Sequence, residues 1–130
     1  MRLTHVANRL DARHFEALVD LLVQKLGFVV LRRTERAIWL RQPGATVDLQ
    51  FTRSDTAHRD ADKQRSQVSF LSDTPEAALH DLAAWLRARG VVAEVGSYSS
   101  REFFLDAPEV FVDFVIEAML PELAEYGMEV

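Results

Sequence analysis

Four polar residues in this sequence have the types and the spacing that a small catalytic or binding site requires. His5 and Gln67 each stand in the opening strand of one half of the chain, and Asp48 and Asp113 each stand in a later apolar strand, 65 positions apart. An imidazole, an amide oxygen and two carboxylates are donors that a hard or borderline divalent ion accepts. If the strands that carry them face one cavity, these four residues predict a metal site.

The chemistry of such a site would follow from the ion. Manganese, nickel, zinc, magnesium or iron would each be compatible with this donor set. An open coordination position would polarise a substrate carbonyl, and Asp113 would then move a proton as the catalytic acid or base. A second hypothesis needs no metal. In that hypothesis the two aspartates are hydrogen-bonded within a polar cavity, with Arg9 or Arg41 as partners.

The stretches that must position these residues occur twice. Residues 38–52 and 103–117 each read as an apolar strand, a proline-containing turn and a second apolar strand with one aspartate. Trp39 in the first copy corresponds to Phe104 in the second. Both aromatic residues are candidates for lining a substrate pocket.

Each copy completes a longer unit that opens with a strand and a helix. Asp11 is a good N-cap for a helix over 12–26 that Gly27 would end, and Pro75 suits the first turn of a helix that Gly90 would end. The predicted fold is α+β, with two tandem βαβββ modules whose curved mixed sheets form a cavity. The predicted strands are 3–10, 28–32, 36–41, 46–52, 67–72, 91–95, 101–105 and 111–116.

A polar segment separates the two modules. Residues 1–54 form the first module and residues 55–65, which contain no large apolar side chain, form a solvated linker. Residues 66–130 form the second module, which closes with a short C-terminal helix. A chain of 130 residues suits one compact domain, or two small halves that share a core.

Composition excludes several classes of protein. The net charge is −5 and no block of Lys or Arg exceeds two residues, so a nucleic-acid partner is not expected. No apolar run approaches a membrane span and no signal peptide opens the chain, so we expect a cytoplasmic protein without a membrane partner. The absence of cysteine excludes disulfides and thiolate metal sites. The negative charge mildly favours a cationic ligand.

The paired βαβββ organisation resembles that of the vicinal oxygen chelate superfamily, which includes glyoxalase I, bleomycin-resistance proteins and extradiol dioxygenases. The resemblance spans residues 3–117 and is carried by THVANRLD, VDLQF, QVSFLSD and DAPEVFVDF. Glyoxalase I places a His or Gln in the first strand, a Glu in the fourth, a His in the fifth and a Glu in the eighth. By resemblance, those places correspond to His5, Asp48, Gln67 and Asp113.

The resemblance also implies roles. Arg9, four residues after the first ligand, falls where the family has an arginine that contacts the thiol part of the substrate. Asp113 would shuttle a proton across an enediolate held by the metal. The sequence departs from the family pattern because both glutamates are aspartates and the second histidine is Gln67. With one histidine in register, the iron-dependent dioxygenase branch is disfavoured.

Two functions remain open. The first is a metal-dependent lyase or isomerase that acts on a small carbonyl or thiohemiacetal substrate, with Arg9 orienting an anionic group. The second is a metal-free protein of the bleomycin-resistance type that binds a small molecule through its acids and aromatic residues. Proteins resembling this family commonly pair modules between chains, so we expect a homodimer.

Overall fold

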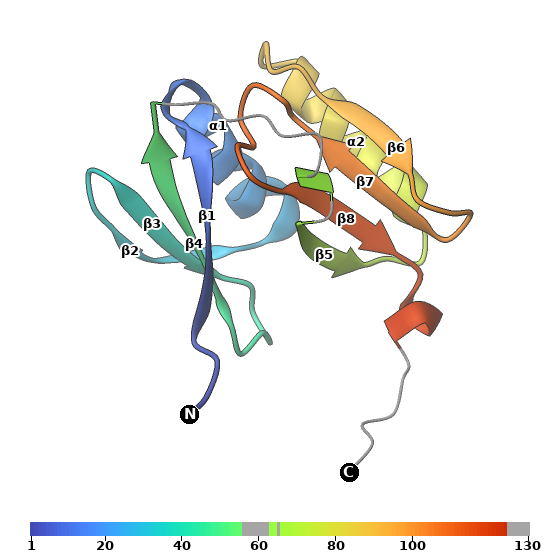
Figure 1. Cartoon of the computed structure of the whole chain (residues 1–130), viewed down its shortest axis with the longest axis horizontal. Helices are drawn as coiled ribbons and strands as arrows, with labels where there is room; N and C mark the ends of the chain where they lie inside the picture. Colours follow the sequence, from blue (N-terminus) through green and yellow to red (C-terminus); the bar gives the residue numbers. More distant parts are fainter. Residues whose placement is uncertain (56–62, 65, 125–130) are drawn as a thin grey trace. The chain divides into compact units, whose positions relative to one another are not determined.

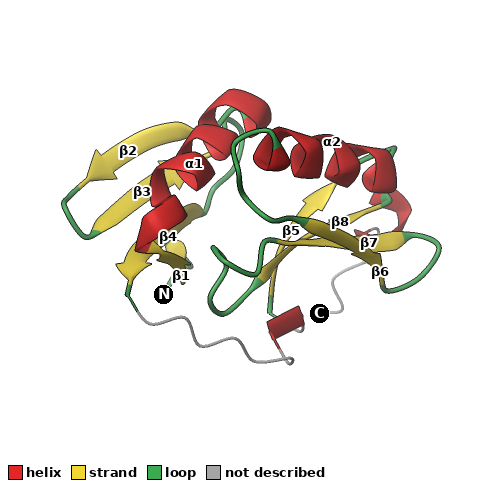
Figure 2. Ribbon diagram, turned by 90° about the horizontal axis from the view of Figure 1, so that it is seen from above, coloured by secondary structure: helices red, strands yellow, loops and turns green. Residues whose placement is uncertain are grey.

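The chain folds as two compact units of the same type. The computed structural model describes all residues except 56–62, 65 and 125–130. One unit comprises Met1–Asp60 with Pro108–Asp113, and the other comprises Ala61–Ala107 with Phe114–Val130. Each contains a four-stranded mixed sheet with a helix over one face (Figure 1; Figure 2). The predicted α+β class and the two βαβββ modules are confirmed. Most of the linker predicted at 55–65 lies outside the described residues.

In the first unit, alternation along the strands separates an apolar face from a polar face. Ile38, Leu40 and Phe51 are buried on the same side as Phe15 and Leu18 of the helix. The polar residues at the alternate positions therefore lie on the opposite, open face of the sheet. The strand order is β1-β4-β3-β2, with β1 and β4 parallel. The elements are β1 (His5–Asp11), α1 (Phe15–Asp20), β2 (Val29–Arg33), β3 (Ala37–Arg41) and β4 (Asp48–Ser54).

The helix predicted over 12–26 is present, but it is not one regular α-helix. It begins with a 3-10 turn (Ala12–His14), continues as α1 and ends in a π-helical turn (Leu21–Lys25). Asp11 caps it as predicted, since its Oδ1 accepts a hydrogen bond from the backbone N–H of Arg13 at 2.9 Å. Gly27 ends it with φ +71°, a conformation that glycine adopts at least cost.

The second unit repeats this arrangement. The stripe predicted on its helix, Leu79, Leu82 and Leu86, is buried. Pro75 begins the helix, and Gly90 follows its end with φ +76°. The strand order is β5-β8-β7-β6, with β5 and β8 parallel. The elements are β5 (Gln67–Leu71), α2 (Pro75–Arg87), β6 (Glu94–Ser97), β7 (Glu102–Asp106), β8 (Val115–Met119) and a 3-10 turn (Pro121–Ala124).

The last strand differs from its predicted position. It was expected over 111–116, whereas β8 runs from Val115 to Met119. The residues before it, Pro108–Asp113, belong to the first unit. There the Asp11 N–H donates to the carbonyl of Val110 at 2.8 Å, and the Val112 N–H donates to that of Arg9 at 3.3 Å. The β7–β8 connection is therefore held by β1.

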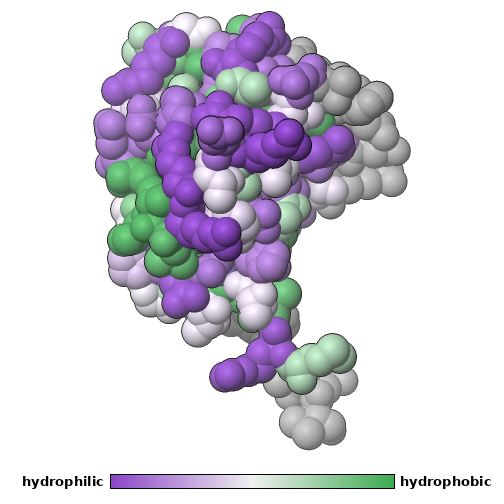
Figure 3. Space-filling view, turned by 90° about the vertical axis from the view of Figure 1, so that its left-hand side faces the viewer, coloured by the Kyte–Doolittle hydropathy of each residue, from purple (hydrophilic) through white to green (hydrophobic). Residues whose placement is uncertain are grey.

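One edge of the first sheet exposes apolar side chains. β2 is an edge strand, and Val29, Val30 and Leu31 are 53%, 41% and 49% exposed. Figure 3 faces this side of the molecule and shows an apolar patch between hydrophilic areas. Within the described residues, no helix has the length and hydropathy needed to cross a membrane.

Candidate functional site

His5 and Asp48, two of the four residues selected from the sequence, lie on neighbouring strands. They are direct cross-strand partners on the parallel strands β1 and β4. The His5 ring is exposed, and its Nδ1 is 3.0 Å from the hydroxyl of Thr4. The backbone N–H of Asp48 donates to the carbonyl of Thr4 at 3.0 Å, which extends this pairing beyond the strand.

The carboxylate of Asp48 is neutralised by an arginine from the neighbouring strand. Arg41 at the end of β3 donates from Nε to Asp48 Oδ1 at 2.5 Å. The Asp48 side chain is 17% exposed and that of Arg41 is 46% exposed. The hydrogen bond and the negative charge of Asp48 raise the pKa of Arg41. Asp48 thus has the kind of partner that the metal-free hypothesis expects.

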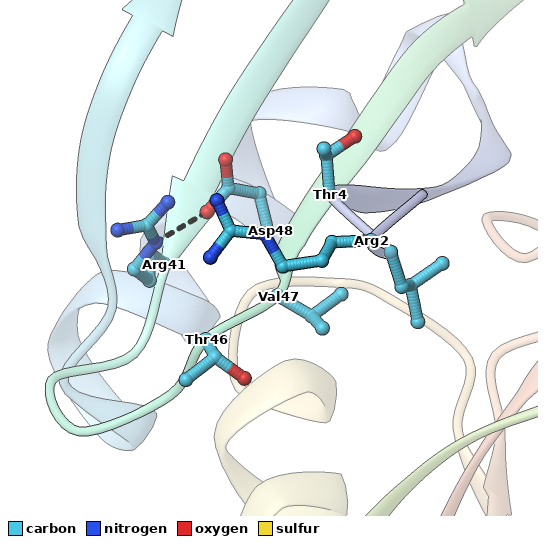
Figure 4. A pocket seen from close by; sticks show the side chains of 7 residues that line it. Arg2, Thr4, Arg41, Thr46, Val47 and Asp48 are labelled. Carbon is cyan, nitrogen blue, oxygen red and sulfur yellow. Dashed lines mark hydrogen bonds and ion pairs between the residues drawn. The ribbon is translucent and has the colours of Figure 1, made fainter.

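A pocket of about 590 Å³ opens beside this ion pair (Figure 4). It contains two guanidinium groups, one carboxylate and two threonine hydroxyls, together with apolar surface from Leu3 and Val47. In Figure 4 the side chain of Arg2 extends toward Asp48 and Arg41. The lining residues are Arg2, Leu3, Thr4, Arg41, Thr46, Val47 and Asp48. All of them belong to the first unit.

Asp113 is not the structural equivalent of Asp48. Residues 42–47 join β3 to β4, whereas residues 107–114 join β7 to β8, so the second connection is two residues longer. The partner of Gln67 on β8 is consequently Val115 rather than an acid. The 65-residue spacing holds for Trp39 and Phe104 but is lost across this longer connection.

Asp113 instead binds the middle of β1. Its Oδ1 accepts from the backbone N–H of Arg9 at 3.2 Å and from Asn8 Nδ2 at 3.5 Å, and its Oδ2 accepts from Arg9 Nε at 3.2 Å. Arg9 lies four residues beyond His5, which is about 13 Å along a strand. Both oxygens of Asp113 are thus engaged well away from the His5–Asp48 pair.

The acid on the last strand is Glu117, which the sequence analysis did not select. It is 7% exposed and is the cross-strand partner of Ser69 on β5 and of Phe104 on β7. Ser69 Oγ donates to Glu117 Oε1 at 2.7 Å. The available signal was one acid among the apolar residues of VIEAM, but the 65-residue spacing pointed to Asp113.

Trp39 and Phe104 occupy equivalent places, as predicted. Trp39 faces Gln50 on β4, and Phe104 faces Glu117 on β8. Their outer neighbours differ. Arg32 on β2 holds its guanidinium carbon 5.0 Å from the centre of the Trp39 ring. Gly96 on β6 leaves room for the Phe104 ring, since a Cβ built there would lie 2.2 Å from Phe104 Cζ.

Gln67 lies at the start of β5 in a hydrogen-bonded group of the second unit. Its side-chain amide donates to the carbonyl of Gln64 at 2.9 Å and to the Tyr98 hydroxyl at 3.3 Å. The Tyr98 hydroxyl donates to the same carbonyl, and its ring centre lies 5.0 Å from that of Phe104. Burial raises the pKa of Tyr98, while the hydrogen bond from Gln67 opposes that shift. The Gln67 amide oxygen does not take part in these bonds.

These side chains, as placed, do not fit a metal ion. The two aspartates predicted as ligands each bind a guanidinium group, which occupies oxygen lone pairs and brings a positive charge to the position a cation would take. In the described part of the chain, no group of three or more His, Asp or Glu residues is arranged to hold an ion.

Comparison with solved structures identifies the fold. A glyoxalase family protein from Enterococcus faecalis is 22% identical, with a TM-score of 0.55 over 91% of this chain and 96% of that one. Lactoylglutathione lyase from Agrobacterium tumefaciens is 12% identical, with a TM-score of 0.58 over 96% and 97%. The bleomycin-binding protein of Streptomyces verticillus, complexed with copper(II)-bleomycin, is 17% identical, with a TM-score of 0.53 over 92% and 98%.

These likenesses confirm the resemblance predicted from the sequence at the level of the fold. The chain has the glyoxalase-like fold that these proteins share. No family model matches the sequence, and no curated protein matches it. Since the same fold carries both enzymes and drug-binding proteins, the function has to be argued from the site.

Proposed function

We propose that this chain binds a small organic molecule without a resident metal ion, on the open face of its first sheet. The observation that carries the proposal is the Arg41–Asp48 ion pair, which occupies the place predicted for a metal ligand. A binding site needs concave surface with a few oriented polar groups, and the pocket beside this pair supplies both.

Aromatic contact would come from Trp39. Residues 39 and 41 alternate to the same face of β3, so Trp39 and Arg41 lie on one face, beside Gln50 and Asp48 of β4. Trp39 thus offers an apolar surface next to a polar pocket. Phe104 and Tyr98 form the corresponding aromatic surface of the second unit. Arg9 is bound to Asp113, so its expected role toward an anionic group would require that pair to open.

The metal-dependent lyase or isomerase is the alternative. It would need His5, Asp48, Gln67 and Asp113 as ligands and Asp113 as the proton carrier. Asp48 and Asp113 would then have to leave Arg41 and Arg9, at the cost of two charge-assisted hydrogen bonds. Lactoylglutathione lyase among the proteins of similar fold keeps this alternative worth testing.

The test compares binding and turnover with and without metal. Protein purified without a histidine tag is treated with EDTA, and its binding of bleomycin and of a methylglyoxal–thiol adduct is measured by calorimetry. We expect metal-free binding to at least one of these compounds. Trp39→Ala should weaken that binding about tenfold, a loss of roughly 1.4 kcal/mol. Trp85→Ala is the matched control, because Trp85 lies on α2, where Arg89 stacks on it.

Two outcomes of this test would contradict the proposed function. Binding or turnover that appears only after loading with manganese, nickel or zinc would support the lyase and overturn this proposal. A protein that binds neither compound in EDTA contradicts it as well. Metal content and turnover of the adduct are measured on the same samples.

We also propose that the protein is a homodimer. β2 is an edge strand with three exposed apolar side chains, and such an edge favours pairing with another chain. Light scattering of the purified chain measures its mass, and a monomer at high concentration would contradict the dimer.

A further inference from the structure

We infer that the pocket of the first unit takes an anionic group of its ligand, a carboxylate or a phosphate, between Arg2 and Arg41. This inference rests on the proposed function, because it names the charge of the molecule that the pocket would bind. It is opposite to the cationic ligand that the net charge of the whole chain mildly favours.

The charged residues that line the pocket sum to a positive charge. Arg2 and Arg41 contribute two positive charges, and Asp48 contributes one negative charge. The surrounding unit has the same sign, since it contains ten of the fifteen Lys and Arg residues but nine of the twenty acids. The second unit, with the other five basic and eleven acidic residues, thus carries a net charge of −6. An anion that approaches this pocket meets a locally positive field.

The hydrogen-bond donors of the pocket suit an anion. Arg41 contacts Asp48 through Nε, and a guanidinium group has four further N–H donors. Its two terminal nitrogens present a fork that matches a carboxylate or a phosphate. Arg2 extends toward the same place in Figure 4. The hydroxyls of Thr4 and Thr46 line the pocket and add donors of ordinary strength.

Asp48 acts in this arrangement as an internal competitor. Its carboxylate already accepts a hydrogen bond from Arg41 and offsets the charge of that arginine. An incoming anion therefore gains less binding free energy from Arg41 than it would from an unpaired arginine. The pair also keeps Arg41 in place when the pocket holds no ligand. Removal of the Asp48 charge should therefore strengthen anion binding, whereas removal of a metal ligand would weaken the binding of a metal-dependent substrate.

The experiment titrates the full chain with inorganic phosphate and, separately, with succinate, in EDTA and at low ionic strength. Backbone amide shifts in NMR spectra report the site. We expect saturable shifts at Thr4, Thr46 and Val47. Arg41→Gln and Arg2→Gln should each weaken binding at least fivefold, and Asp48→Asn should strengthen it at least threefold. Arg36→Gln is the matched control, because Arg36 is exposed and does not line the pocket.

Three outcomes would overturn the inference. Equal losses in Arg36→Gln and Arg41→Gln would mean that the anions respond to net charge alone. Shifts confined to other residues would place the anions elsewhere. Unchanged or weaker anion binding in Asp48→Asn would contradict the proposed competition between Asp48 and the anion. Thermal melts of each variant show that it is folded.

Failure of this inference is distinguishable from failure of the proposed function. If bleomycin or the thiol adduct binds without metal but phosphate and succinate do not compete, only the anionic group is wrong. If organic binding requires a metal while the anion titration succeeds, the proposed function is wrong and the anion pocket remains.

Discussion

The two units share one topology but hold their acids in different ways. In the first unit Asp48 and Asp113 are bound by Arg41 and Arg9, and these pairs are substantially exposed on the arginine side. In the second unit Glu117 is bound by the neutral hydroxyl of Ser69, and the ion pair of Asp106 is buried. The first unit has a slight excess of positive charge and the second a large excess of negative charge. Duplicate sheets thus kept their apolar positions while their polar positions diverged.

This difference shows which positions of the two sheets determine the polar groups that each unit presents. The buried positions of each sheet, such as Ile38 and Leu105, are set by packing and tolerate little change. On the opposite face, arginine and glycine occupy equivalent places beside Trp39 and Phe104. Each of the following changes tests one contrast between the units.

The largest effect is expected from the buried ion pair of the second unit. Lys63 Nζ lies 2.7 Å from Asp106 Oδ1, and the two side chains are 7% and 11% exposed. Lys63→Met leaves a buried carboxylate without its charge partner and should lower the free energy of unfolding by about 3 kcal/mol. Arg9→Met, which breaks the exposed pair with Asp113, should cost less than about 1 kcal/mol. Urea unfolding of both variants measures the contrast, and equal losses would contradict it.

A smaller effect is expected beside the two aromatic residues. In Gly96→Ala the new Cβ meets the Phe104 ring, which has to move away, and the variant should lose about 1–3 kcal/mol of stability. Arg32→Ala at the equivalent place removes only a guanidinium stacked on Trp39 and should cost about 0.5 kcal/mol. Thermal unfolding compares the two, and near-ultraviolet circular dichroism reports the Tyr98–Phe104 packing. If Arg32→Ala is the more damaging change, the equivalence of these places is wrong.

The smallest effect concerns the start of the first helix and depends on pH. The hydrogen bond from the Arg13 side chain lowers the pKa of Asp11 against the opposing effect of burial. A lowered folded-state pKa contributes stability above the unfolded value of about 3.9, and that stability is lost as pH falls through the folded value. Asp11→Asn should therefore cost about 0.5 kcal/mol at pH 7, and wild type and variant should converge in acid.

The control for this pH dependence comes from the second unit. Ser72 there accepts a hydrogen bond from the Thr74 N–H at 3.1 Å without a titrating group. Ser72→Ala should lower stability by a similar amount that does not change with pH between 3 and 7. Unfolding curves across that range distinguish the two hydrogen bonds, and a pH-independent Asp11→Asn would refute the assignment.

Much of the fold could be predicted because its signals are local. Helical spacing of Leu79, Leu82 and Leu86 and the positive φ of Gly27 and Gly90 depend on neighbours within a few residues. His5 and Asp48 were selected from the repeat, and their pairing across β1 and β4 was seen only in the structure. The equivalence of Trp39 and Phe104 followed from the same repeat.

The rest of the candidate site depended on connections that no local pattern reveals. Two additional residues before β8 place Val115, rather than Asp113, opposite Gln67, and they place Glu117 opposite Ser69. Asp48 and Asp113 are each held by an ion pair with an arginine. The partners of Asp113 lie more than a hundred positions away along the chain. Residues 108–113 lie with the first unit because their backbone pairs with β1.

The sequence by itself determined that this chain makes two βαβββ modules, because apolar periodicity and helix-ending glycines act over short distances. Only the tertiary structure decided which acid stands in the last strand and which cation neutralises each carboxylate. Register and ion pairing depend on loop length and on contacts between distant segments, so they appear only when the strands are assembled.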